Sequence, residues 1–94
     1  MTKQEIFSND ITWLAQKKRI GEELNKIEDL IKSYKDPNTN AINRSIAANN
    51  ISVHGETVRK EHGKLESIEA VVLREFSYLN PDIVIEDYDD DPIH

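Results

Sequence analysis

The chain has 94 residues, enough for one domain, with 37% hydrophobic and 32% charged residues and a net charge of −6 at pH 7. The absence of cysteine excludes disulfides and thiolate metal sites, and no apolar run reaches the roughly 18 residues that a membrane span needs. The N-terminal sequence lacks the apolar core of a secretory signal. We therefore expect a cytoplasmic protein.

The negative charge is concentrated at the C-terminal end. Residues 80–94 hold six acidic residues and no Lys or Arg, whereas the remaining residues hold 12 acidic and 12 basic ones. A nucleic-acid mimic would instead carry acids over a whole face of its fold. Strongly β-favouring runs are nearly absent and glycine and proline are scarce, with three residues each. We therefore expect an all-α domain over residues 1–80 and an extended acidic tail over residues 81–94.

Capping patterns predict where the first two helices begin and end. Thr2 and Glu5 have the spacing of a capping box, in which each side chain satisfies a free N–H group, so we expect a short helix over about residues 2–8. The Ser-Asn-Asp run at residues 8–10 then offers either a new N-cap or a kink. Pro37 ends the second helix, because proline forces the preceding residue out of the helical region.

The second helix carries the clearest periodic pattern of the chain. Its apolar residues recur at alternating spacings of three and four from Trp13 to Tyr34, which is typical of a coiled-coil seam about three heptads long. Lys17 falls on one of these seam positions. A lysine there is costly unless it reaches solvent, sets the register or meets a ligand.

The residues after the turn predict further helix, with two alternatives. Thr39 or Asn40 would cap it. Paired asparagines and Gly55 weaken the middle, since a glycine costs about 1 kcal/mol relative to alanine. The pattern therefore allows one long helix with a kink near Gly55, or two helices broken there. An apolar stripe then returns, with His62 on the same face, and stops at Asn80.

Two long helices joined by a short turn predict an antiparallel helical hairpin with one shared seam. Such a hairpin leaves Ile11, Leu14 and other apolar residues without cover, and small domains bury little surface. We therefore expect the hairpin to pack into an oligomeric helical bundle. The residues expected at its seam are Ile20, Leu24, Ile27, Ile31, Tyr34, Leu65, Ile68, Val72 and Phe76.

The sequence offers no constellation for catalysis or metal binding. His54 and His62 are eight residues apart and miss the i, i+4 spacing that chelates one ion. Nucleophile-elbow and glycine-rich phosphate-loop motifs are absent, because the glycines are isolated. Paired carboxylates fall on faces expected to be solvated. We expect no enzyme activity, no catalytic residue, no metal and no cofactor.

A cluster of basic residues is the first candidate binding site. In a hairpin, residues 17–19 lie level with residues 59 and 60, and together they could bind a phosphate or another anion. The alternative is a solvated face balanced by glutamates, with the tryptophan in the core rather than stacked on a base. The residues of this candidate site are Trp13, Lys17, Arg19, Arg59 and Lys60.

The tail is the second candidate binding site. Its short apolar run, flanked by acids, could add a strand to the sheet edge of a partner, and its acids could steer it towards a basic site. The alternative is a solubilising end whose isoleucines cover the hairpin tip. The tail residues concerned are Ile83, Val84, Ile85, Glu86, Asp87, Asp89, Asp90 and Asp91.

Together these features favour a non-enzymatic interaction protein that self-associates and binds, and inhibits or modulates, another macromolecule. Inhibitors, immunity proteins, antitoxins and viral accessory factors are proteins of this kind. The expected partners are copies of the chain and a protein with a basic site, rather than nucleic acid or a membrane. One alternative is an oligomeric bundle that sequesters a small phosphate-bearing ligand such as a nucleotide, and another is a structural or assembly component.

Overall fold

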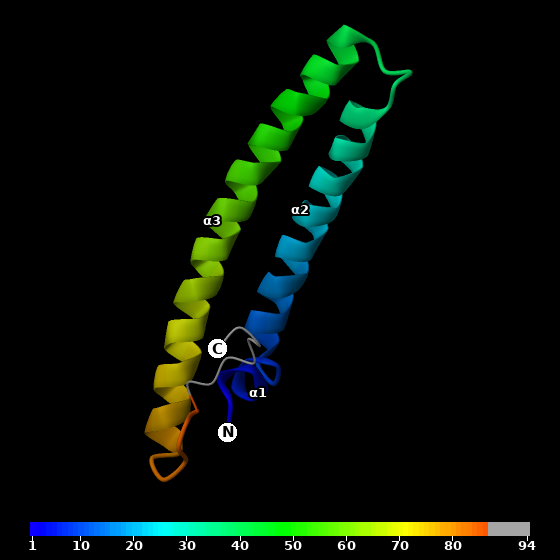
Figure 1. Ribbon diagram of the computed structural model, residues 1–94. Coiled ribbons are helices and arrows are strands. Elements are labelled where there is room, and N and C mark those ends of the chain that lie inside the picture. Colours follow the sequence, from blue (N-terminus) through cyan, green and yellow to red (C-terminus); the bar gives the residue numbers. More distant parts are fainter. Residues whose placement is uncertain (87–94) are drawn as a thin grey trace.

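The computed structural model describes residues 1–86 and contains three helices within them, α1 (Lys3–Phe7), α2 (Ile11–Lys35) and α3 (Ala41–Leu79) (Figure 1). Over the same residues the only β pairing is an isolated bridge between Thr2 and Glu86. The predicted all-α class is confirmed.

Side-chain caps set the starts of all three helices. The Thr2 hydroxyl accepts a hydrogen bond from the backbone N–H of Glu5 at 3.2 Å, and α1 follows. Asp10 and Asn40 each accept from the backbone N–H three residues further on, at 2.9 and 2.8 Å, and they cap α2 and α3. Each cap satisfies a donor that has no partner within its helix. Of the alternatives left open at residues 8–10, the new N-cap is therefore correct.

The turn between α2 and α3 is held by local hydrogen bonds. The Asp36 carboxylate accepts from the N–H of Asn38 at 2.9 Å, and the Thr39 hydroxyl donates to the Ser33 carbonyl at 2.8 Å. Beyond this turn α3 runs as one helix past Gly55, so the alternative with two helices is wrong. Packing against α2 offsets the low helix propensity of the glycine.

The two long helices lie side by side and run in opposite directions (Figure 1). Gln16 of α2 contacts Glu61 of α3, and Glu23 contacts His54, so the numbering rises on one helix as it falls on the other. The result is a rod of 61 × 27 × 16 Å. Figure 1 shows α1 at the end of the rod that carries the N-terminus, away from the turn between α2 and α3. We call this end (residues 1–16 and 66–86) the terminal half, and residues 17–65 the turn half.

The core is small and extends from the terminal half across its boundary with the turn half. Its buried cluster consists of Phe7, Trp13, Ile20 and Leu65, and the rings of Phe7 and Trp13 stack at 5.6 Å between centroids. No large side chain among the described residues is less than 2% exposed. Two helices cannot enclose a side chain on all sides, so a third element is needed, and α1 supplies it at one end only.

The predicted seam residues divide into three groups by burial. Ile20 and Leu65 are buried, whereas Leu24, Ile31 and Tyr34 are 49%, 38% and 43% exposed. The rest of the predicted seam, Ile27, Ile68, Val72 and Phe76, is half-buried. Two of the nine predicted seam residues are thus buried between the helices, four are partly covered, and three are exposed to solvent.

The first part of the tail returns to the N-terminus. The backbone N–H of Glu86 donates to the Met1 carbonyl at 2.8 Å, and the Met1 amino group donates to the Val84 carbonyl at 3.2 Å. Ile85 is half-buried, while Ile83 and Val84 are exposed. The acidic tail positions Asp87, Asp89, Asp90 and Asp91 lie outside the described residues.

Candidate interaction surface

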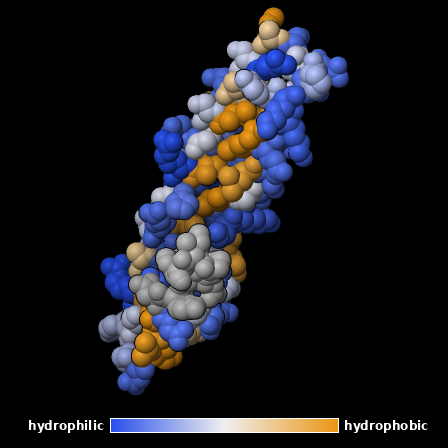
Figure 2. All heavy atoms as spheres, in the orientation of Figure 1, coloured by the Kyte–Doolittle hydropathy of each residue, from blue (hydrophilic) through white to orange (hydrophobic). Residues whose placement is uncertain are grey.

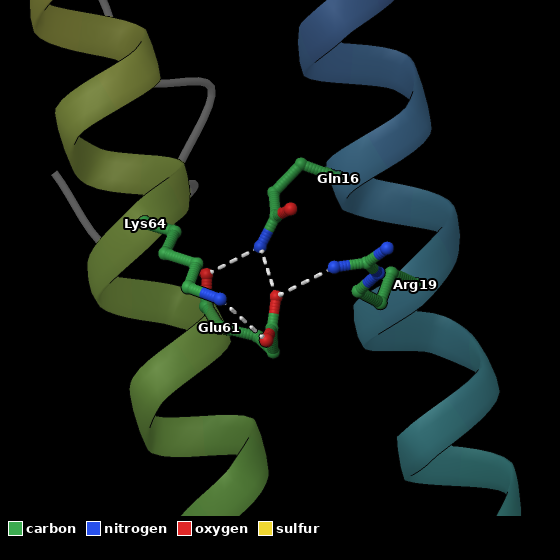
Figure 3. Close-up of polar contacts among 4 residues, drawn as sticks. All are labelled: Gln16, Arg19, Glu61 and Lys64. Atoms are coloured by element: carbon green, nitrogen blue, oxygen red, sulfur yellow. Dashed lines mark hydrogen bonds and ion pairs between the residues drawn. The ribbon is translucent and has the colours of Figure 1, made fainter.

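A buried polar cluster crosses the groove between α2 and α3. The Gln16 amide donates to the carboxylate of Glu61 at 2.7 Å and to its backbone carbonyl at 2.8 Å. Lys64 lies 3.1 Å from the same carboxylate and Arg19 lies 3.8 Å from it. Figure 3 shows these four side chains converging from the two helices. We call this side of the groove the polar flank.

Two further polar contacts fix the register of the helices. The imidazole of His54 lies 2.8 Å from the Glu23 carboxylate. The same carboxylate accepts a hydrogen bond from the Lys26 ammonium at 3.1 Å. The indole N–H of Trp13 donates to Glu69 at 2.9 Å. A shift of α2 along α3 would leave these groups without partners, and an unpaired buried polar group is costly.

Both seam carboxylates are held in the charged form. The hydrogen bond from Gln16, followed by the one from Lys64, lowers the pKa of Glu61 below its ordinary value of 4.5. The hydrogen bond to His54, followed by the one from Lys26, lowers the pKa of Glu23 in the same way. Hydrogen bonding to a charged form favours that form.

These shifts predict that acid weakens the helix pair. Because the folded-state pKa of Glu61 is depressed, its contribution to stability is present above about pH 4.5 and is lost as the pH falls through the lowered pKa. Glu61→Gln should therefore lower the free energy of unfolding at pH 7, and the difference from the wild type should shrink at pH 3. Urea unfolding at both pH values measures this. Glu22→Gln, at an exposed position, is the matched control, and a Glu61→Gln difference unchanged by pH would contradict the expectation.

The residues of the predicted anion site do not converge. Trp13 is buried, and Lys17 lies over its ring at 5.6 Å. Lys17 and Arg19 are two residues apart on α2, about 200° around the helix. Arg19 pairs with Glu61, while Arg59 pairs with Glu56 at 3.3 Å. Lys60, the remaining member of the predicted site, is exposed. These contacts favour a core role for Trp13 and a solvated role for the cations.

Sequence reasoning missed the polar residues of the seam. It placed Lys17 and His62 at seam positions, but both are exposed, and Gln16 and His54 face the opposite helix instead. Spacings of three and four allow either residue 16 or residue 17 after Trp13. A pattern based on apolar residues favours the set that contains Lys17 and Leu24. In the structure Glu23 points towards α3 instead, because its carboxylate is hydrogen-bonded to His54.

An apolar stripe occupies the other side of the groove. Leu24 is about 140° around α2 from Arg19, and Ile51 is about 140° around α3 from Lys64, so both lie opposite the polar flank. Ile31 follows Leu24 by seven residues and Val58 follows Ile51 by seven, which keeps them on the same faces. Figure 2 shows this stripe between the helices in the turn half. We call Leu24, Ile31, Ile51 and Val58 the apolar flank.

A second apolar surface lies on the part of α3 nearest to the turn. Ile42, Ile46 and Val53 are 73%, 54% and 54% exposed, and spacings of four and seven place them on one face. Among residues 41–54 the only Lys, Arg, Asp or Glu is Arg44. Exposed apolar side chains gathered on an uncharged surface are typical of a contact site for another macromolecule. We call this set the outer α3 face.

Comparison with known proteins gives no match: no protein-family model, curated protein or solved structure resembles the chain. Within residues 1–86 no three His, Asp or Glu side chains are close enough to hold a metal ion. In the same range neither long helix is apolar enough to cross a bilayer. The candidate site is therefore defined by its own geometry, as a pair of apolar surfaces on a helix pair.

Proposed function

We propose that this chain is a non-enzymatic interaction protein, a helical hairpin that self-associates and also binds another macromolecule, whose activity it inhibits or modulates. The observation that carries the proposal is the exposure of apolar side chains on two separate surfaces: Leu24 and Ile31 on the apolar flank, and Ile42, Ile46 and Val53 on the outer α3 face. Leaving them in water forgoes about 25 cal/mol for each Å² that a partner would cover. Two separate surfaces suit two different contacts.

The macromolecular partner is assigned to the outer α3 face. This surface combines Ile42, Ile46 and Val53 with neutral asparagine and serine side chains, and such a mixture resembles the apolar centre and polar rim of a protein–protein interface. The six acidic residues in the sequence 80–94 would steer the complex towards a basic partner. Binding there would act by occluding the partner's own site.

The phosphate-ligand alternative has less support. Its cations Arg19 and Arg59 already pair with glutamates, and the ring proposed to stack on a base is buried against Phe7. A phosphate would have to displace those carboxylates. The other alternative is a structural or assembly component that binds only copies of itself. It would explain the exposure of the apolar flank but not that of the outer α3 face.

A double substitution on the outer α3 face tests the proposal. Ile46→Asp with Val53→Asp should abolish capture of a protein partner from a lysate of the cells in which the chain is naturally made, because two charges replace the apolar contact. Quantitative mass spectrometry of the captured proteins is the measurement. Ile11→Asp, at an 84% exposed position at the other end of the rod, is the matched control and should retain the partner.

Two outcomes would contradict the proposal in different ways. A partner retained by the double variant would mean that the outer α3 face is not the contact. If the wild type captured no protein in fixed ratio, the macromolecular function would be lost and the alternative of a structural or assembly component would stand. Circular dichroism of each variant checks that α3 remains folded.

A further inference from the structure

The turn half of the rod lacks a third layer. In the terminal half α1 packs on the helix pair and covers Trp13 with Phe7. In the turn half no described element lies over the apolar flank, and Leu24 and Ile31 remain exposed. The helix pair therefore has a third element packed on it in the terminal half and, among the described residues, an uncovered apolar flank in the turn half.

Two glycines lie beside the apolar flank, one on each helix. Gly21 precedes Leu24 by three residues, and Gly55 lies between Ile51 and Val58, so helical spacing places both on the apolar flank. A Cβ atom added at either glycine would meet nothing within 4 Å. The packing of one chain thus does not require glycine there, although each costs about 1 kcal/mol of helix propensity. Glycines on a helix surface allow another backbone to approach closely.

We infer that a second copy of this chain covers the apolar flank, with the two rods antiparallel and related by a two-fold axis perpendicular to their length. This inference rests on the self-association in the proposed function and adds the surface and the orientation. In an isologous dimer the same patch on both subunits must be complementary to itself. The apolar flank meets this requirement.

The two-fold relation matches the spacing of residues on both helices. An antiparallel copy places α2 on α2 and α3 on α3. Gly21 then lies opposite Leu24 of the partner subunit, and Gly55 lies opposite Val58 of the partner subunit. A two-fold axis must pass midway between the two residues of each pair. On α2 this midpoint lies next to Glu23, and on α3 it lies within about three residues of His54. Because Glu23 and His54 are in contact, a single axis can relate both helices to their copies. Each larger side chain fills the space beside a glycine.

Charges beside the stripe fit the same arrangement. The axis that pairs Gly21 with the partner's Leu24 also brings Lys17 to the partner's Glu28, four residues further out on each side. Lys17 and Glu28 are both exposed and on the apolar flank side of α2. The pair occurs twice in the dimer by symmetry.

A parallel dimer would instead collect like charges. It would place α2 on the partner's α3, with Lys35 opposite the partner's Arg44, a like-charge pair, and with Lys17 level with the partner's His62. The terminal half holds seven acidic and two basic residues, and the turn half holds seven acidic and ten basic ones. Parallel rods would set the two acidic ends side by side, whereas antiparallel rods keep them apart.

A charge exchange tests the antiparallel pairing. Glu28→Lys should weaken the dimer about tenfold at low salt, because two opposite-charge contacts become like-charge contacts. Adding Lys17→Glu to the same chain should restore the wild-type dissociation constant. Within one chain Lys17 and Glu28 are eleven residues apart on one helix, about 16 Å, so the rescue requires a second copy. Analytical ultracentrifugation measures both.

Cross-linking separates the two orientations, and the absence of cysteine makes single thiols unambiguous. A short bis-maleimide should join Lys17→Cys to Glu28→Cys when the two variants are mixed, and should not join Lys17→Cys to His62→Cys. Cross-links to His62→Cys, or a Glu28→Lys loss that Lys17→Glu does not restore, would overturn the antiparallel inference while leaving self-association intact. A wild type that remains monomeric in the ultracentrifuge would overturn the inference and the self-association together, whatever the outcome for the outer α3 face.

Discussion

Replacing Trp13 with alanine should lower the free energy of unfolding by about 3–5 kcal/mol, the usual cost of removing a buried tryptophan. Trp13 is 4% exposed, stacks on Phe7 and donates its indole N–H to Glu69. It therefore joins α1 to α2, in addition to the packing of α1 against α3. In a domain of this size the loss corresponds to a melting temperature lower by at least about 12 °C.

Thermal unfolding followed by circular dichroism at 222 nm measures this effect. Trp13→Phe keeps a ring against Phe7 but removes the hydrogen bond to Glu69, worth about 1–2 kcal/mol, together with part of the buried ring volume, so it should fall between the wild type and Trp13→Ala. Tyr78→Ala is the surface control, because Tyr78 is 85% exposed. If Trp13→Ala melted at the same temperature as Tyr78→Ala, the small core would not be what holds the terminal half together.

Leu24→Asp should weaken self-association at least about 100-fold, a loss of roughly 2.7 kcal/mol or more. In the inferred dimer each Leu24 packs beside a glycine of the partner subunit, so the substitution places two carboxylates in an apolar interface and removes the side chains that fill the space beside the glycines. In the single chain Leu24 is 49% exposed. The fold should therefore tolerate the change far better than the assembly does.

Sedimentation equilibrium over a range of protein concentrations gives the dissociation constant. Tyr78→Asp removes a side chain that is more exposed than Leu24 and lies at the far end of α3, and it should leave the dimer intact. An equal loss in both variants would attribute the effect to charge in general. An unchanged dissociation constant for Leu24→Asp would exclude the apolar flank as the interface.

The helices themselves were accessible from the sequence because their signals are local. Thr2, Asp10 and Asn40 are capping residues whose partners lie three positions away, and Asn80 follows α3 directly. Such short-range chemistry needs no knowledge of the fold. The continuity of α3 through Gly55 was not accessible, since it depends on packing against α2 rather than on the propensity of the glycine.

The inward-facing residues were harder to predict because they are chosen by what lies opposite. Gln16 and Glu61 are polar, and a search for apolar spacing passes over both. They are buried because each completes the hydrogen bonding of the other. The same reason explains His54, whose seam position depends on Glu23 thirty-one residues away in the chain. A periodic pattern locates the inward face of a helix to within one residue. Contacts with the opposite helix then decide which of two adjacent sets of residues points inward.

The position of the core near the termini sets the order in which the chain can fold. Contacts near the turn close short loops, but they bring together few buried apolar side chains there. The stabilising contacts, such as Trp13 with Glu69, join residues 56 apart and can form only after a long loop has closed, at a larger entropic cost. Local opening should consequently start at the turn, where the backbone connection is closest, and spread towards the chain ends. The region near the turn therefore has the shortest chain connection between the two helices and the fewest buried apolar contacts between them.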